Sequence, residues 1–211
     1  MAIHVFGLTG GIATGKSTVA ARWQQRRLPV VDADELARQV VAPGSAGLAA
    51  LLQLMGNDVL RADGSLDRAR VASRAFSNAQ LRLALEAILH PRIQEALDCR
   101  IRALEQQDET LACYEASLLV EVGRADFYRP LVVVVAEQSA QLQRALARNG
   151  QRGSEVRSRI SSQAPMSQKA AAADIVITND GTLDELQMKA DATLAQVCSK
   201  LNLDPSRYEI V

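Results

Sequence analysis

The sequence has no excess of charge of either sign, because Lys plus Arg and Asp plus Glu number 24 each among its 211 residues. No overall field therefore draws the chain to nucleic acid or to an acidic membrane surface, and any basic patch must be local. We accordingly expect neither nucleic acid nor a membrane among its partners.

Cysteine is scarce and has no recognisable pattern. The three cysteines, Cys99, Cys113 and Cys198, are scattered and odd in number, with neither metal-ligand spacing nor a disulfide framework. Reduced thiols in a cytoplasmic protein are the expected state.

Long apolar segments and repeats are missing as well. The first apolar run ends at Leu8 without a basic region before it, and no run approaches the about 18 apolar residues of a membrane span. No internal repeat or low-complexity segment stands out. With 48% hydrophobic residues, the chain is expected to form one α/β unit with a small subdomain.

Residues 7–18 read GLTGGIATGKST between an apolar strand expected at 3–8 and a helix expected at 16–27. They fit the phosphate-binding pattern G-x-x-x-x-G-K-[ST], in which glycines let backbone N–H groups wrap around phosphate oxygens. In this pattern Lys16 reaches the β- and γ-phosphates and Ser17 offers its hydroxyl to Mg²⁺. A chance match to a glycine-rich turn is the alternative, and the flanking strand and helix argue against it. The predicted nucleotide-binding residues are Gly11, Ile12, Ala13, Thr14, Gly15, Lys16, Ser17 and Thr18.

Two acids follow the next expected strand, 29–31, before a helix expected over 35–41. Ligands of open α/β sheets bind beyond the carboxyl ends of the strands, so acids at this point are expected near the phosphate loop. Alternation along an extended segment turns Asp32 and Asp34 to the same side, so that both can face the site. The alternative is that Asp32 caps the helix, and we accept this for one of the two acids.

After Pro43-Gly44 the pattern becomes almost entirely helical as far as residue 107, with turns at 56–58 and 63–65. His90-Pro91 interrupts an apolar helical run, and Pro91 suits the first turn of a new helix. A histidine beside a proline is more often packed and hydrogen-bonded than catalytic, although contact of His90 with a substrate phosphate stays an alternative.

Three further strands are expected at 110–114, 131–135 and 175–177. The first of them leaves Glu115 at its carboxyl end, where P-loop proteins often hold an acid that supports Mg²⁺; a solvated cap is the alternative. The last leads into 178–181, a loop over which an adenine base commonly lies, so Asn179 is a nucleotide-binding candidate. Thr182 is expected to cap the final helix, which runs through Leu201.

Between the fourth and fifth strands lie two basic helical segments joined by glycine-bearing residues 149–153. Arg144 and Arg148 lie one turn apart in the first segment, and Arg157 and Arg159 lie in the second. This pattern predicts a mobile lid that supplies positive charge to a transferring phosphate, rather than the solvated basic face of an ordinary helical hairpin.

The order of these elements predicts an α/β protein with the P-loop NTPase fold, in which a five-stranded parallel sheet lies in a three-layer α/β/α arrangement. A helical insertion after the second strand and a lid after the fourth are typical of a P-loop kinase rather than of a motor or a GTPase. The expected parts are a core at 1–42, 108–137 and 173–211, a helical insertion at 43–107 and a lid at 138–172.

End to end, the chain resembles bacterial dephospho-coenzyme A kinases. The resemblance is carried by segments that follow one another in that family's order and spacing: GLTGGIATGKSTVA, VVDADELARQVV, ILHPRI, SLLVE, QLQRALAR, RISSQ and ITNDG. It implies MgATP-dependent phosphorylation of the 3′-hydroxyl on the ribose of dephospho-CoA, the last step of coenzyme A synthesis. It also implies that the helical insertion binds the CoA substrate.

The resemblance also implies roles for single residues. Asp34 is similar to the acid that takes the hydroxyl proton, Lys16 and Ser17 are the phosphate and Mg²⁺ ligands, and Arg144 and Arg148 resemble the lid arginines. The positions similar to acceptor-binding residues are Thr9, Asp34, His90, Leu118 and Glu121.

The chain departs from the family pattern at two positions. Ala13 stands where the family usually has glycine, and we expect nucleotide binding to survive with slightly altered backbone geometry. Ser117 stands where proline is usual, which affects only the expected rigidity of that turn.

Two other functions remain alternatives. One is a different small-molecule or nucleotide P-loop kinase, which a helical insertion of this length disfavours. The other is a regulatory ATP-binding protein without catalysis. A GTPase would carry Asn-Lys-x-Asp, and residues 178–181 do not supply it.

Overall fold

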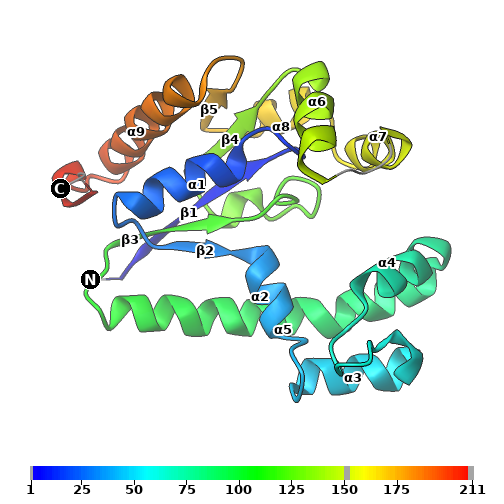
Figure 1. Cartoon of the computed structure of the whole chain (residues 1–211). Helices are drawn as coiled ribbons and strands as arrows, with labels where there is room; N and C mark the ends of the chain where they lie inside the picture. The colour runs from blue at the N-terminus through cyan, green and yellow to red at the C-terminus, as the bar shows by residue number, and fades with distance from the viewer. Residues whose placement is uncertain (1, 150–152, 209–211) are drawn as a thin grey trace. The chain divides into compact units, whose positions relative to one another are not determined.

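The computed structural model describes residues 2–149 and 153–208. These fall into two compact units, the first formed by Met1–Val31 with Leu104–Val211 and the second by Asp32–Ala103. Figure 1 labels the helices and strands of both. None of the helices in the described part is long and apolar enough to cross a bilayer.

The first unit is built on a five-stranded sheet. β1 (His4–Gly10) pairs in parallel with β3 (Leu111–Glu115) and β4 (Leu131–Val135), and β4 pairs in parallel with β5 (Ile175–Thr178). With β2 (Val30–Asp32) the strand order is β2-β3-β1-β4-β5. Every residue of β3 is buried, as expected for strands covered on both faces. The predicted parallel α/β sheet of the P-loop NTPase type is confirmed.

Helices α1 (Lys16–Gln25) and α9 (Leu183–Lys200) lie side by side against the sheet (Figure 1). Trp23 of α1 is fully buried; its ring meets Phe6 edge-on, and its Nε1 donates to the carbonyl of Ala190 at 2.8 Å. Arg22 also pairs with Asp191 of α9 at 2.6 Å. These contacts fix the helix that follows the phosphate loop.

Thr182 caps α9 as predicted. Its side chain accepts from the backbone N–H of Glu185, and Glu185 accepts in return from the N–H of Thr182, which forms a complete capping box. The chain then ends its described part in the short helix η3 (Pro205–Tyr208), while η2 (Ala125–Phe127) precedes β4.

The second unit is helical, as predicted for this region. It contains α2 (Ala33–Gln39), α3 (Ala46–Met55), η1 (Asn57–Val59), α4 (Arg68–Ser77) and most of α5 (Ala79–Glu105). Its own apolar core is formed by Val41, Leu48, Leu51, Met55, Val59, Leu66 and Val71. Gly56 and Gly64 take positive φ angles of 82° and 78° at the two predicted turns.

The predicted helix break at Pro91 is wrong, because α5 continues through it. Proline removes one backbone donor from a helix interior and crowds the preceding turn. Here the guanidinium of Arg92 donates to the carbonyl of Ile88 at 2.7 Å, so a side chain hydrogen-bonds a backbone acceptor in the turn before the proline. Apolar packing of Leu81, Leu85 and Leu89 on the core of this unit also stabilises the helix at this point.

The predicted extended geometry of the Asp32-Ala33-Asp34 segment is also wrong. Helix α2 begins at Ala33, so Asp34 already lies in its first turn. Asp32 is the N-cap, and its Oδ1 accepts from the backbone N–H of Asp34 at 2.8 Å. The alternative that one of the two acids caps the helix is therefore confirmed, and the two side chains do not follow the alternation of a strand.

Among the described residues between β4 and β5 there are three helices, namely α6 (Gln138–Asn149), α7 (Gly153–Ser161) and α8 (Met166–Ala171). The predicted hinge residues 150–152 lie outside the described part of the chain. α6 and α7 pack against each other, and α8 packs against β4.

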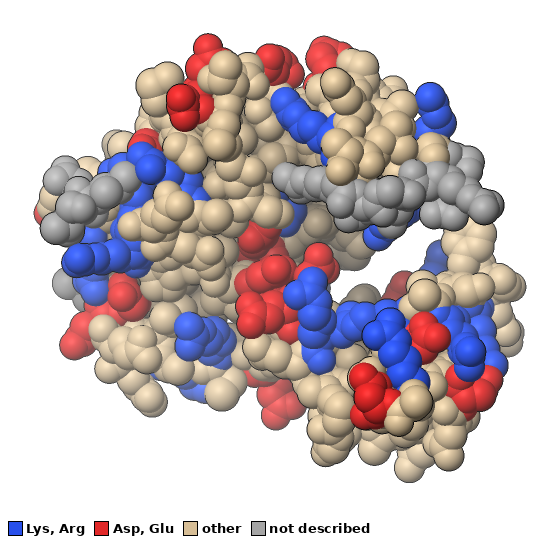
Figure 2. All heavy atoms as spheres, viewed as in Figure 1, with Lys and Arg blue, Asp and Glu red and all other residues tan. Residues whose placement is uncertain are grey.

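Charged side chains of both signs are interspersed on the face shown in Figure 2. This agrees with the equal numbers of acidic and basic residues in the sequence.

Candidate active site

The phosphate loop joins the last residue of β1, Gly10, to the first residue of α1, Lys16. Within it, the hydroxyl of the buried Thr14 donates to the carbonyl of Gly11 at 3.0 Å. Gly15 has a φ of 99°, and a Cβ at this position would lie 2.4 Å from Nδ2 of Asn179. Both the backbone angle and the close approach therefore require glycine at position 15.

Asn179, predicted to bind nucleotide, holds the loop from the end of β5. Its Nδ2 donates to the carbonyl of Thr14 at 2.8 Å, and its backbone N–H donates to Val135 at 2.8 Å. Its own carbonyl accepts from Nη2 of Arg144 at 3.1 Å. Asn179 thus links the loop to β4 and to α6, and its contact with a nucleotide stays a prediction.

Lys16 forms an ion pair with Glu115, the last residue of β3. Both side chains are nearly buried, with 11% and 8% of their surfaces exposed. Since β3 lies next to β1 in the sheet, the pair joins the carboxyl ends of two neighbouring strands. Burial raises the pKa of the nearby Cys113 thiol well above its usual range, and the charge of Glu115 adds to this shift.

The residues fit a Mg²⁺ ion of the kind that P-loop kinases use. Ser17 is exposed in the first turn of α1, where its hydroxyl is accessible, and Glu115 supplies a carboxylate beside Lys16. Mg²⁺ usually takes only one or two protein ligands and completes its shell with water and substrate phosphates. The absence of a cluster of three or more His, Cys, Asp or Glu among the described residues is therefore compatible with such a site.

Of the two arginines predicted in the first basic segment, Arg144 is the one whose side chain the structure describes. Its Nη2 donates to Asn179, while its Nη1 is buried without a hydrogen-bond partner among the described residues. This nitrogen therefore has a donor that is not used within the described part of the protein. Arg144 contacts Asn179, which in turn contacts the phosphate loop, so the unused donor is suited to an anionic ligand. The side chain of Arg148 lies outside the described part of the structure.

Three predicted acceptor-binding residues lie in the first unit. Thr9 is fully buried in β1, and its hydroxyl is without a partner in the described part. Leu118 follows β3 and is 46% exposed. Glu121 is held by two groups, because its Oε1 accepts from Nζ of Lys169 at 2.7 Å and from the N–H of Ala164 at 3.0 Å.

Asp34 and His90 belong to the second unit, and both are exposed. The expectation that His90 is packed and hydrogen-bonded is wrong, because its side chain is exposed and forms no hydrogen bond with the described residues. Asp34 lies near two arginines of the same unit. Desolvation and the positive charge of Arg38 lower the pKa of Arg68, and the negative charge of Asp34 opposes this shift.

Sequence reasoning missed the residues that cover the start of the phosphate loop. The backbone N–H of Ile12 donates to Oε1 of Gln163 at 2.9 Å. A Cβ on Gly11 would lie 2.8 Å from Cε of Met166 and 3.1 Å from Oε1 of Gln141. The RISSQ segment contains Gln163, but no local pattern in it indicates a partner 151 residues away.

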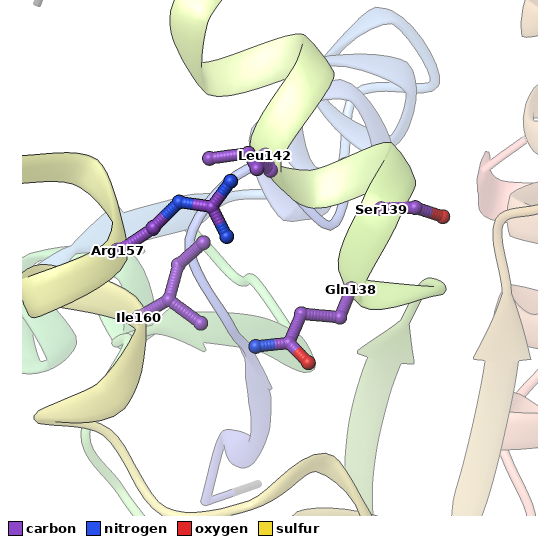
Figure 3. A pocket seen from close by; sticks show the side chains of 5 residues that line it. All are labelled: Gln138, Ser139, Leu142, Arg157 and Ile160. Atoms are coloured by element: carbon purple, nitrogen blue, oxygen red, sulfur yellow. The ribbon is translucent and has the colours of Figure 1, made fainter. Parts of the chain in front are cut away.

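A pocket of about 290 Å³ lies between α6 and α7 (Figure 3). Its walls are Gln138, Ser139, Leu142, Arg157 and Ile160. Figure 3 shows the Arg157 guanidinium and the Gln138 amide approaching it from different helices. No residue of the phosphate loop lines it, so it is a separate feature of the predicted lid.

The structure gives a reason for the glycine that is usual at position 13. Ala13 has a φ of 57°, in the left-handed region, which costs an L-residue about 1–2 kcal/mol. Ala13→Gly removes this cost and adds about 0.5–1 kcal/mol of chain entropy loss on folding. We expect the free energy of unfolding to rise by up to about 1 kcal/mol, as measured by denaturant titration, and the ATP affinity to stay within about twofold.

The matched control for Ala13→Gly is Ala21→Gly, at an exposed position of α1. This substitution should lower the free energy of unfolding by about 1 kcal/mol, because glycine is a poor helix former. A loss of similar size at position 13 would contradict the strain argument.

The strand–loop–helix phosphate site at the carboxyl ends of β1 and β3, with the Lys16–Glu115 pair and Arg144 beside it, defines a P-loop kinase. A family model described as dephospho-CoA kinase matches residues 4–185. The chain therefore belongs to the dephospho-CoA kinase family.

Individual relatives agree with this assignment. The dephospho-CoA kinase of Anaeromyxobacter dehalogenans is 44% identical over 195 residues, which cover 92% of each chain. That of Corynebacterium glutamicum is 41% identical over 196 residues, covering 93% of this chain and 98% of the relative. The crystal structure of TT1252 from Thermus thermophilus superposes with a TM-score of 0.81 at 31% identity, covering 93% of this chain and 99% of that one.

Proposed function

We propose that this chain carries out the reaction of its family, the ATP-dependent phosphorylation of dephospho-CoA on the 3′-hydroxyl of its ribose, which is the final step of CoA biosynthesis. The observation that carries the proposal is the family match over residues 4–185 together with an intact phosphate loop. The loop supplies the nucleotide site, and the family supplies the acceptor.

Different residues of the first unit bind different parts of ATP. Backbone N–H groups of the loop bind the phosphates. The ammonium group of Lys16, which pairs with Glu115 in this structure, turns partly away from that carboxylate and binds the β- and γ-phosphates. Arg144, whose Nη1 has no hydrogen-bond partner among the described residues, would donate to the triphosphate. Ser17, supported by Glu115, would hold Mg²⁺, which neutralises phosphate charge when bound. Phosphoryl transfer needs little more from a protein than in-line positioning and such charge compensation.

Asp34 is proposed as the residue that orients the acceptor hydroxyl and removes its proton. Its place in the first turn of α2, two residues after the cap Asp32, and its match to the family's acid support this role. The acceptor-binding roles of Thr9, His90, Leu118 and Glu121, and of the helical insertion 43–107, rest on the same resemblance. The adenine contact of Asn179 is proposed from its place in the loop after the last strand, and the closing motion of the lid 138–172 from its basic helical segments.

A reducing compartment such as the cytoplasm is proposed as the location. All three cysteines are free, and two of them, Cys113 and Cys198, are buried. Free thiols are typical of intracellular proteins.

An acceptor screen tests the proposed function. Purified protein is incubated with radiolabelled ATP and Mg²⁺ and with dephospho-CoA, adenosine, AMP or shikimate, and the labelled products are identified. We expect transfer to dephospho-CoA at the 3′-position and no comparable transfer to the others. Faster transfer to another alcohol would identify a different small-molecule kinase, and ATP binding without any transfer would favour a regulatory protein.

The double substitution Arg144→Ala, Arg148→Ala tests the lid. Loss of a single charge-assisted hydrogen bond to phosphate costs about 1.5–3 kcal/mol, so the transfer rate of the double variant should fall by at least about 10- to 100-fold. Single-turnover kinetics measure this fall. Arg61→Ala, an exposed arginine in a turn of the second unit, is the control and should leave the rate unchanged. An unchanged rate in the double variant would remove these arginines from the reaction.

A further inference from the structure

A side chain occupies part of the phosphate loop in the structure. The backbone N–H of Ile12 lies among the loop's variable positions, and it donates to Oε1 of Gln163 at 2.9 Å. Gln163 comes from the segment between α7 and α8, so this bond ties the predicted lid to the loop. Its acceptor is a neutral amide oxygen.

The segment that carries Gln163 is firmly held at its next residue. The N–H of Ala164 donates to Oε1 of Glu121 at 3.0 Å, and the same oxygen pairs with Nζ of Lys169. Lys169 is fully buried and also donates to the carbonyl of Ser117 at 2.8 Å. The network pins residues 164–169 to the turn after β3, and Gln163 is the first residue beyond it.

The side of the loop that Gln163 contacts is also covered by a second residue of this segment. Cε of Met166 lies 2.8 Å from where a Cβ on Gly11 would be placed. Gln163 and Met166 therefore lie over the first two variable positions of the phosphate loop. Phosphate oxygens that approach the N–H of Ile12 must displace the Gln163 amide, because a backbone N–H makes one good hydrogen bond.

We propose that Oε1 of Gln163 takes the place of a phosphate oxygen at the N–H of Ile12, and that the nucleotide's phosphate groups displace it from there. Charged phosphate oxygens accept hydrogen bonds about twice as strongly as neutral amide oxygens, so they win this exchange. The exchange releases the Gln163 side chain from the loop, while the network of Glu121 and Lys169 keeps residues 164–169 in place. The proposal rests on the proposed function only in that the loop binds nucleotide phosphates.

Binding of nucleotide to Gln163→Ala, without acceptor, tests this exchange. Loss of an intramolecular competitor worth one neutral hydrogen bond should tighten ATP binding by about two- to tenfold, measured by isothermal titration calorimetry. Binding of adenosine, which has no phosphate, should not change. Gln168→Ala is the matched control, since Gln168 is exposed on α8, and it should bind ATP as the unaltered protein does.

Gln163→Glu gives a second, opposite test. A carboxylate keeps the bond from Ile12, strengthens it and repels the triphosphate, so ATP should bind at least about tenfold more weakly. In the unaltered protein, the amide resonance of Ile12 should also shift when inorganic triphosphate is added, whatever the stability of the variants.

The proposal is overturned if Gln163→Ala binds ATP with unchanged or lower affinity, or if the Ile12 amide does not respond to triphosphate. Both measurements omit the acceptor. A negative result in these binding measurements therefore does not contradict the proposed kinase activity. A negative result in the acceptor screen likewise does not change what the binding measurements say about Gln163.

Discussion

Asp34→Asn is expected to lower the rate of phosphoryl transfer by about 10²- to 10⁴-fold while ATP affinity stays unchanged. A positioned general base contributes about this much to a rate, and asparagine keeps the size of the side chain but removes its basicity. The fold should tolerate the change, because α2 is capped through the backbone N–H of Asp34 and not through its side chain. The rate is measured with saturating dephospho-CoA and the affinity by calorimetry.

Asp32→Asn is the matched control for this prediction. Asn is as good a helix cap as Asp, so this variant should keep stability, ATP affinity and turnover close to those of the unaltered protein. If Asp34→Asn retained turnover within about threefold, Asp34 would not be the base. If Asp32→Asn lost turnover as strongly, the assignment of the two acids would have to be exchanged.

Lys16→Met is expected to reduce both transfer and stability. The ammonium group is the one that reaches the transferring phosphate, and loss of such a group lowers rates by about 10²- to 10³-fold. The same substitution leaves Glu115 nearly buried without its counter-ion. Removal of one partner of a buried pair costs about 3–5 kcal/mol, so the free energy of unfolding in denaturant should fall by about that amount.

The double variant Lys16→Met, Glu115→Gln separates the two effects. A neutral amide at position 115 needs no counter-ion, so most of the lost stability should return. Transfer should remain slow, because no positive charge is restored. Full stability in the single variant would contradict the energetic role of the pair, and restored transfer in the double variant would contradict the catalytic role of Lys16.

Much of the fold was predictable because its signals are local in sequence. The run of β-branched residues at 131–135 forms β4 with the expected bounds, and the capping box at Thr182 starts α9 where predicted. The motif with Gly15 and Lys16 fixed the place of the phosphate loop between a strand and a helix. Each of these signals lies within a few residues, and no distant contact in the described part of the structure opposes the local preference.

Where prediction failed, distant or packing contacts decided. Pro91 is a strong local helix breaker, yet α5 passes through it, because Leu81, Leu85 and Leu89 pack the helix on the core of its unit. At Asp34, helix initiation by the Asp32 cap prevailed over the strand alternation from which its direction was inferred. Nothing in the Ala-rich stretch around Lys169 indicates that its ammonium is buried against Glu121.

The sequence alone determined the class of protein, its phosphate loop and the positions of its strands along the chain, because these depend on residue types at fixed short spacings. Only the tertiary structure decided the partners of those residues. Lys16 meets Glu115 across 99 positions, Ile12 meets Gln163 across 151, and Thr14 meets Asn179 across 165. The physical reason is that a hydrogen bond or an ion pair forms when folding places two groups a few ångströms apart, and separation along the chain does not encode that proximity.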